Sequence, residues 1–234
     1  HDVNLVNFKR QYPDFLFPGK TQYEKGISAV SVPSCRILDS INPINWIKCT
    51  KYILALNPDL VIFRYWNPFF APMMGFIANR MKNSNIHLMS ICDNIIPHEQ
   101  KFYDKYLSKY FLSKMNSHIV QSKIVEYELL DLFPNCKYKK LFHPLYNVFS
   151  NVNNQKQSRT KLKISHKHVI LYMGMVRKYK GFDVLIHSAK YLKEKFHDFI
   201  VIAIGESYEP EKKYRDLIKS LNIEDVFKWE NKYV

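Results

Sequence analysis

Apolar stretches of strand length alternate with amphipathic segments of helical length along the whole chain. Asparagine–proline pairs at Asn42-Pro43 and Asn67-Pro68 mark the starts of two of the helices. Strands joined by helices in this way form parallel sheets that helices cover. The sequence therefore predicts an α/β fold, with strands at residues 2–8, 36–39, 60–63, 85–92, 117–121, 137–142, 169–173, 199–204 and 226–229.

One polar segment, residues 151–158, has no apolar periodicity and is the best linker candidate in the chain. It separates a predicted N-terminal domain, residues 1–150, from a second domain, residues 159–234, which opens with a short helix at 159–163. A lone first strand rarely begins an α/β domain, and the sequence stops soon after its last strand starts. We expect both domains to be incomplete and the chain to be a fragment.

The chain carries a net charge of +14, which is shared equally between residues 1–154 and 155–234. A nucleic-acid-binding protein more often concentrates its charge on one patch, so no specific nucleic acid is expected. The charge favours an anionic membrane surface or an anionic substrate. The abundance of Lys, Asn, Ile, Tyr and Phe could equally reflect an AT-rich coding sequence, and the two explanations stay open.

Residues 60–79 contain a single charged residue, Arg64, and are almost long enough to cross a membrane. Pro68 and Pro72 interrupt this stretch, which favours a buried strand followed by a helix. A basic helix predicted at residues 100–114 carries a stripe of lysines beside a stripe of aromatic residues. Such a helix suits a membrane surface, or it is half-buried with solvated lysines and tyrosines that reach toward water.

The four cysteines form no C-x-x-C pair, and no histidine stands at zinc-binding spacing from them. Buried free thiols in a reducing compartment are the simplest interpretation. The chain also begins without a signal or transit peptide. We expect a cytoplasmic protein, either free or peripheral on the inner face of the membrane.

The region around Gly174 passes from a strand through a glycine turn into a helix. The apolar run 169–173 predicts a buried strand, and Gly181 opens a helix that continues for about four turns. Arg177 and Lys180 lie between the two glycines. A helix N-terminus offers free N–H groups, Arg a planar fork, Lys a point charge, and glycine a close approach of the backbone. Together these features predict a socket for a phosphate group.

The spacing G-x-x-R-x-x-K-G is neither the Walker loop nor the dinucleotide-binding fingerprint. A surface turn with ordinary lysines is the alternative, because the chain is rich in lysine. Other predicted strands also end in polar residues, at the edge where parallel sheets bind ligands. These ends carry Arg64-Tyr65-Trp66, residues 93–99, Ser122, His143 and Gly205-Glu206.

The loop spacing resembles the donor-binding loop of retaining glycosyltransferases of family 4, which have the GT-B fold. The resemblance extends over nearly the whole chain. Its most specific parts are residues 64–72 (RYWNPFFAP), 93–99 (DNIIPHE), 143–144 (HP) and 174–181. It implies two Rossmann-like parallel-sheet domains that face each other across a cleft, with the donor on one side and the acceptor on the other.

The resemblance also assigns roles to single residues. Arg177 and Lys180 would neutralise the diphosphate of a nucleotide sugar, and His98 would lie near the transferred sugar. The implied donor-binding residues are Gly174, Arg177, Lys180, Gly181, Gly205 and Glu206. The implied catalytic residues are His98, Glu99 and Asp93.

The resemblance implies transfer of a sugar, with retention, from a nucleotide-diphosphate sugar to a saccharide or lipid-linked acceptor. Fixed cations stabilise the charge that develops on the leaving diphosphate. Neither a metal nor a cofactor is implied, and the sequence contains no D-x-D motif. The family's later glutamate motif and its N-terminal glycine loop have no counterpart here, so weak donor binding and little turnover are expected.

Several of these residues have simpler structural explanations. His98 and Glu99 could cap or stabilise the start of the helix predicted at residue 100. Arg64 could pair with Asp93 across neighbouring strand ends, and His143 could only shape the turn before a proline. At the level of the whole chain, a non-catalytic basic protein that binds membrane or nucleic acid, and a related enzyme such as a nucleotide-sugar epimerase, remain alternatives.

Overall fold

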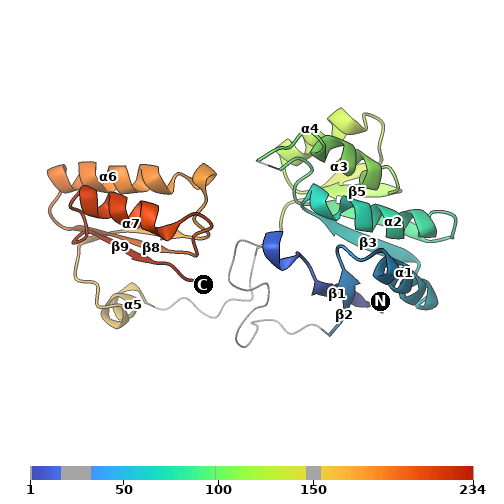
Figure 1. Cartoon of the computed structure of the whole chain (residues 1–234), viewed down its shortest axis with the longest axis horizontal. Helices are drawn as coiled ribbons and strands as arrows, with labels where there is room; N and C mark the ends of the chain where they lie inside the picture. The colour runs from blue at the N-terminus through green and yellow to red at the C-terminus, as the bar shows by residue number, and fades with distance from the viewer. Residues whose placement is uncertain (1, 17–32, 98, 146–153, 234) are drawn as a thin grey trace. The chain divides into compact units, whose positions relative to one another are not determined.

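The structure, a computed structural model, describes residues 2–16, 33–97, 99–145 and 154–233, and it divides into two compact units (Figure 1). Unit 1 contains β1 to β6 with α1 to α4, and unit 2 contains α5 to β9. All strand pairs between described residues are parallel. The predicted α/β class with parallel sheets is therefore confirmed.

The elements of unit 1 follow the predicted alternation closely. They are β1 (Leu5–Arg10), β2 (Ser34–Asp39), α1 (Pro43–Ala55), β3 (Leu60–Tyr65), η2 (Pro68–Phe70), α2 (Ala71–Met81), β4 (His87–Cys92), α3 (Asp104–Leu112), β5 (Ser117–Val120), α4 (Lys123–Leu132) and β6 (Tyr138–Lys140). A short 3-10 helix, η1 (Asp14–Leu16), follows β1. β1 pairs with β2, and the order of the larger sheet is β3-β4-β5-β6.

The elements of unit 2 form one three-stranded sheet with helices. They are α5 (Gln155–Lys161), β7 (His168–Met173), η3 (Lys178–Lys180), α6 (Phe182–Lys195), β8 (Phe199–Ile204), α7 (Glu211–Ser220) and β9 (Phe227–Glu230). The strand order is β7-β8-β9.

Polar side chains fix the starts of three elements in unit 1. Asn42 caps α1 by accepting hydrogen bonds from the backbone N–H groups of Ile44 and Asn45, at 3.0 and 3.2 Å. Asn67 caps η2, and Ser122 caps α4 through the N–H of Val125. The predicted helix start at Asn42 is confirmed, and Asn67 begins a 3-10 helix that leads directly into α2.

Each unit has its own hydrophobic core on one side of its sheet. In unit 1, buried residues of β3, α2 and α3 pack together, with Tyr65, Phe70 and Phe111 among the largest. In unit 2, Phe182 contacts the rings of Tyr172, Tyr214, Phe227 and Trp229. Figure 1 shows α6 and α7 on the same side of β8 and β9.

The opposite face of each sheet carries exposed apolar side chains, which corrects the prediction of fully buried strands. On β7, Leu171 is 62% and Met173 71% exposed, and on β3, Ile62 is 51% exposed. On β3 and β7 these side chains alternate with residues that point into the core, so these two strands are buried on one side only. Parallel strands are normally covered on both faces. No helix among the described residues covers the second face.

Three predicted boundaries shift. The helix predicted from residue 100 begins at Asp104, because the Asp104 carboxylate accepts the N–H of Lys101 at 2.8 Å and closes a turn before the helix. The short helix predicted at 159–163 is α5, which Asn154 caps by accepting the N–H of Lys156. Residues 155–158 of the predicted linker therefore lie in α5, and residues 151–153 lie outside the described residues.

Candidate donor-binding site at the ends of β7 and β8

The backbone at Gly174 is held against the end of the neighbouring strand. Gly174 has φ +128°, which favours glycine, and its N–H donates to the carbonyl of Ile204 at 3.0 Å. A Cβ on Gly205 would lie 1.8 Å from the carbonyl oxygen of Gly174. Both predicted glycines are thus needed where the two strand ends touch.

Lys180 folds back over this junction. Its Nζ lies 3.6 Å from the position that a Cβ on Gly174 would occupy, so the ammonium group sits beside the glycine backbone. Gly181 then adopts the left-handed conformation, with φ +65°, and α6 begins at Phe182. Because the first N–H groups of a helix have no partner within the helix, this start adds partial positive charge beside the Lys180 ammonium.

Arg177 lies immediately before η3 with extended backbone. Its Cζ lies 4.7 Å from the ring centroid of Tyr208, and its Nε is buried without a hydrogen-bond partner. The guanidinium is therefore held by the face of an aromatic ring. Tyr208 comes from the segment after β8. It was not predicted as a site residue, because its distance in sequence from Arg177 does not indicate that the two side chains are in contact.

Gly205 and Glu206 occupy the end of β8, as predicted. The N–H of Gly205 donates to the backbone carbonyl of Glu230 at 3.1 Å, and the carbonyl of Gly205 accepts the indole N–H of Trp229 at 3.2 Å. Glu206 is 7% exposed, and its carbonyl accepts the N–H of Val176 at 2.9 Å. The residues at the ends of β7, β8 and β9 are thus joined to one another by hydrogen bonds.

In unit 1, Asp93 follows β4 directly and pairs with Arg64 at the end of β3. The Arg64 Nε and Nη2 donate to the two Asp93 carboxylate oxygens at 2.8 and 3.5 Å. The Asp93 N–H also donates to the carbonyl of Tyr65 at 2.8 Å. The predicted pairing of Arg64 with Asp93 across neighbouring strand ends is confirmed, and this pairing orients the Asp93 carboxylate.

The segment after Asp93 is fixed by side chains from two helices. The carboxylate of Glu128, on α4, accepts the N–H groups of Ile95 and Ile96 at 3.4 and 3.2 Å. Ser108, on α3, donates to the carbonyl of Ile95 at 2.8 Å and bonds the Tyr65 hydroxyl at 2.8 Å. Sequence reasoning missed these anchors, because each contact joins residues 13 or more apart in the chain.

Of the three catalytic candidates, Asp93 is described above, and the other two are His98 and Glu99. His98 lies outside the described residues. Glu99 is exposed and does not belong to the first turn of α3, where the acidic residue is Asp104. The prediction that Glu99 stabilises the helix start is therefore wrong. His143 is exposed and bonds the carbonyl of Pro144 at 2.9 Å, which agrees with a role in shaping that turn.

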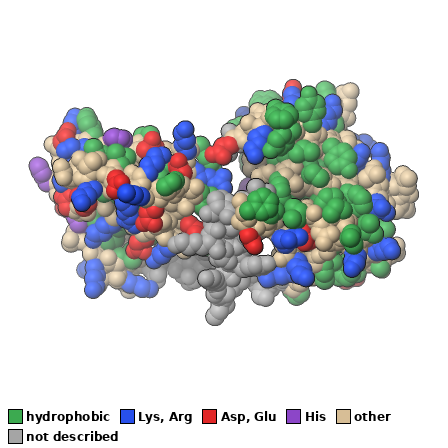
Figure 2. All heavy atoms as spheres, in the orientation of Figure 1, with side chains coloured by type: hydrophobic (Ala, Val, Ile, Leu, Met, Phe, Trp, Pro, Cys, Tyr) green, Lys and Arg blue, Asp and Glu red, His purple; other side chains and the backbone are tan. Residues whose placement is uncertain are grey.

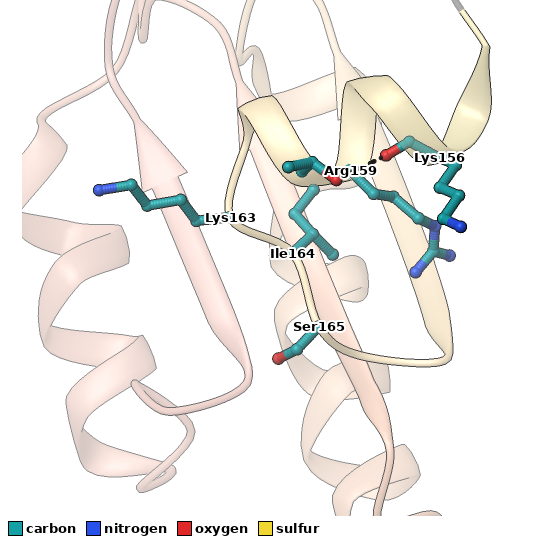
Figure 3. A pocket seen from close by; sticks show the side chains of 6 residues that line it. Lys156, Arg159, Lys163, Ile164 and Ser165 are labelled. Atoms are coloured by element: carbon teal, nitrogen blue, oxygen red, sulfur yellow. Dashed lines mark hydrogen bonds between the residues drawn. The ribbon is translucent and has the colours of Figure 1, made fainter.

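A separate hollow of about 500 Å³ lies beside α5 (Figure 3). Its lining includes Lys156, Arg159, Lys163 and Ser165, and Lys163 points away from the other two cations in this view. The Arg159 guanidinium donates to the carbonyls of His166 and Lys167, at 2.5 and 3.1 Å. This hollow therefore lies at the amino end of β7, away from Gly174 at the carboxyl end.

The four cysteines are free thiols, as expected. Cys49 and Cys92 are buried, whereas Cys35 and Cys136 are only partly buried. Burial raises the pKa of Cys92 to about 12, which keeps its thiol protonated. Among the described residues, no group of three or more His, Cys, Asp or Glu side chains could hold a metal ion.

The comparison with family profiles matches residues 153–232 to the family described as Glycosyl transferases group 1. This segment contains all the donor-site residues described above. A search of curated protein sequences finds no match to the chain.

Solved structures with a similar fold span both units of the chain. One is HepE from Anabaena with bound UDP-glucose, with TM-score 0.65 and 12% identity over 86% of this chain and 56% of that one. Another is a glycosyltransferase from Rickettsia africae, with TM-score 0.58 and 18% identity over 84% of this chain and 54% of that one. A third is Staphylococcus aureus TarM with UDP, with TM-score 0.53 and 18% identity over 80% of this chain and 36% of that one.

The chain thus spans about half the length of the first two structures and about a third of the third. At these identities the likeness concerns the fold alone. The chain has an α/β fold with parallel sheets similar to that of GT-B glycosyltransferase structures, and its residues 153–232 match the group 1 glycosyl transferases.

Proposed function

We propose that the chain belongs to a retaining, metal-independent glycosyltransferase that uses a nucleotide-diphosphate sugar as donor. Unit 2 takes up the donor, and unit 1 takes up a saccharide or lipid-linked acceptor. The HepE and TarM structures contain UDP-glucose and UDP, which supports a uridine nucleotide as the first donor to test. Support from sequence is local, because the family match covers residues 153–232.

The observation that carries the proposal is the position of the Lys180 ammonium beside the backbone of Gly174. Lys180 lies over Gly174, and Arg177 precedes the same short helix. Two positive side chains and a helix start therefore accompany a stretch of backbone that carries no Cβ. An anionic diphosphate can approach such backbone closely and gains from each of these charges.

The chemistry needs little else from unit 2. The bond between the anomeric carbon and the diphosphate oxygen breaks, and its electron pair stays on that oxygen. The anomeric carbon bonds to an acceptor hydroxyl oxygen, and the hydroxyl proton leaves to the departing phosphate or to solvent. Arg177 and Lys180 stabilise the charge as it develops on the leaving oxygen.

The donor site can be tested with UDP. Arg177→Ala combined with Lys180→Ala should weaken UDP binding, measured by isothermal titration calorimetry, at least roughly 30-fold, because each charged hydrogen bond contributes about 1.5–3 kcal/mol. The matched control removes two exposed lysines of α7, with Lys212→Ala and Lys219→Ala. This control should bind UDP like the original chain.

Equal weakening by both pairs would favour the alternative, a basic protein that holds anions without a specific site. Absence of UDP binding at millimolar concentration, with circular dichroism unchanged, would overturn the donor site itself. Incubation with UDP-sugars separates the remaining alternatives, since an epimerase changes the free donor whereas a transferase releases UDP. Retention predicts that a transferred sugar keeps the anomeric configuration of the donor.

A second candidate activity, binding to an anionic membrane, has support on unit 1. Phe102 is 88% and Tyr106 76% exposed, and on α4 Ile124 is 70% and Tyr127 69% exposed. α3 is half-buried, with Ser108, Phe111 and Leu112 in the core, as the simpler prediction expects. Phe102 and Tyr106 nevertheless lie on the surface of this region, where lipid could contact them. Figure 2 shows hydrophobic side chains gathered among Lys and Arg on the visible face of unit 1.

We propose that this surface lies on anionic lipid at the inner face of the membrane and brings a lipid-linked acceptor near. Lys109, an exposed lysine of the same region, adds attraction to lipid phosphates, whereas the Lys105 ammonium pairs with the Asp131 carboxylate at 2.6 Å. Among the described residues, no helix is both long enough and apolar enough to pass through a bilayer. The proposal therefore concerns binding at the surface.

Vesicle sedimentation tests this activity. The chain should sediment with vesicles that contain phosphatidylserine. Phe102→Ser with Tyr106→Ser should reduce the bound fraction roughly 10-fold, because these substitutions remove apolar area that the lipid would bury. The matched control is Tyr191→Ser with Phe196→Ser in unit 2, whose side chains are 56% and 54% exposed. Equal partitioning of the chain to neutral and anionic vesicles would rule out a contribution of lysine charge to membrane binding.

A further inference from the structure

Arg177 is oriented by an aromatic ring and not by a carboxylate. Its Cζ lies 4.7 Å from the ring centroid of Tyr208. None of the ion pairs between described residues includes Arg177. A carboxylate would hold the guanidinium but also neutralise it, whereas a ring holds it and leaves its charge available to an anionic ligand.

The backbone fixes the ring in place. The N–H of Tyr208 donates to the carbonyl of Val176 at 3.0 Å, and the N–H of Val176 donates to the carbonyl of Glu206 at 2.9 Å. Val176 is fully buried and directly precedes Arg177. The ring and the guanidinium therefore come from two segments that are hydrogen-bonded to each other one residue away from the contact.

Ser207 secures the same segment from the other side. Its N–H donates to the side-chain oxygen of Asn231 at 2.8 Å, and its hydroxyl donates to the carbonyl of Glu209 at 2.9 Å. The position of the Tyr208 ring is thus set by backbone and side-chain bonds on both sides of it. The Arg177 Nε is buried without a hydrogen bond, so the guanidinium is inserted with its stem enclosed.

From this geometry we infer that Tyr208 is the positioning residue of the donor site. Its ring holds the Arg177 guanidinium in the orientation in which the N–H groups bind the diphosphate. The inference rests on the proposed donor site and adds a residue that the motif spacing does not contain. A cation–π contact of about 0.5–2 kcal/mol corresponds to roughly 2- to 30-fold in ligand affinity.

The test compares two probes, UDP and inorganic pyrophosphate, by isothermal titration calorimetry. Tyr208→Leu should weaken both probes by the same factor, about 3- to 30-fold, because the ring acts through Arg177 on the diphosphate. Tyr208→Phe keeps the ring and should stay within about 3-fold of the original chain. In an Arg177→Ala background, Tyr208→Leu should cause no further loss.

Other outcomes overturn the inference in distinguishable ways. Loss of UDP binding with pyrophosphate binding unchanged would mean that the ring contacts the base. Additive losses for the two substitutions would mean that Tyr208 does not act through Arg177. If Tyr208→Leu binds with the original affinity while Arg177→Ala binds weakly, the inference about Tyr208 is wrong but the proposed donor site stands. If the original chain binds neither UDP nor pyrophosphate, both the inference and the proposed donor site are wrong.

Circular dichroism and the thermal midpoint provide the folding check for each variant. If Tyr208→Leu unfolds unit 2, Tyr208→Gln serves as the second variant, since it fills the space with a polar chain and still lacks a ring. The same equal loss for UDP and pyrophosphate is expected. An unchanged affinity in a folded Tyr208→Gln would contradict the inference.

Discussion

At the scale of single residues, the burial of His118 makes the stability of unit 1 depend on pH. His118 on β5 is 4% exposed, and its Nδ1 bonds the Ser90 hydroxyl at 2.8 Å. Its ring stacks on that of Phe133. Burial lowers the pKa of His118 from its ordinary 6.5 to about 4, so the ring is neutral in the folded unit.

Unit 1 should therefore lose stability as the pH falls from 6.5 toward 4. The unfolded chain takes up a proton at His118 at a higher pH than the folded chain does, which favours unfolding in that window. The full effect is about 3 kcal/mol, and about 2 kcal/mol is lost by pH 5. Urea unfolding monitored at pH 8 and pH 5 measures it.

His118→Asn should flatten this dependence between the two pH values. His87→Gln is the matched control, because His87 is exposed on the neighbouring strand β4. An equal change of slope in both variants would show that His118 does not dominate acid sensitivity.

At the scale of elements, the ends of β7 and β8 work as one structure. Gly174 and Gly205 touch through their backbones, and the segments that follow them exchange hydrogen bonds between Val176, Glu206 and Tyr208. The conformation of the loop after β7 is therefore set by contacts with the end of β8, about thirty residues later in the chain. A substitution at the end of β8 should therefore change the affinity for a ligand that contacts the loop after β7.

Gly205→Ala tests this dependence. The new Cβ would lie 1.8 Å from the Gly174 carbonyl oxygen, so the strand ends must separate. We expect a loss of about 1–3 kcal/mol in unfolding free energy, together with weaker UDP binding. Gly181→Ala is the comparison, because it strains a left-handed backbone by about 1 kcal/mol while its Cβ would meet nothing closer than 3.7 Å.

The order of the two losses decides the outcome. If Gly205→Ala is as stable as the original chain and binds UDP equally, then the two strand ends do not need their close contact. A larger loss in Gly181→Ala would shift the explanation from steric contact to backbone conformation.

At the scale of the whole molecule, the four-stranded sheet of unit 1 and the three-stranded sheet of unit 2 each leave apolar side chains exposed on one face. Leu171 and Met173 of β7 are 62% and 71% exposed, and Leu60 and Ile62 of β3 are 42% and 51% exposed. The chain of 234 residues should therefore bind the hydrophobic dye ANS in its folded state.

Leu171→Thr with Met173→Thr should reduce this dye fluorescence while changing the unfolding free energy by less than about 1 kcal/mol, since threonine suits an exposed strand. The matched control is Ile170→Thr on the covered face, which packs against the core of unit 2. It should cost about 1–3 kcal/mol and leave the dye signal of the folded chain unchanged. Undiminished fluorescence in the double variant would mean that this face is not accessible.

Local signals predicted the elements well. Asparagine caps, proline at helix starts and glycine at strand ends act through contacts within a few residues, so Asn42 and Gly174 could be predicted directly from the sequence. The helix predicted from residue 100 exists, but its start was predicted four residues too early, because the turn that precedes it depends on one hydrogen bond from the Lys101 N–H to the Asp104 side chain.

The sequence alone determined the alternation of strands and helices and the order of glycines and cations in the loop after β7, because periodicity and backbone preference are local properties. Only the tertiary structure decided that Tyr208 supports Arg177, that Glu128 and Ser108 anchor the segment after Asp93, and that one face of each sheet is exposed. These features depend on contacts between residues far apart in the chain. Such contacts exist only after the strands have taken their places in the sheets.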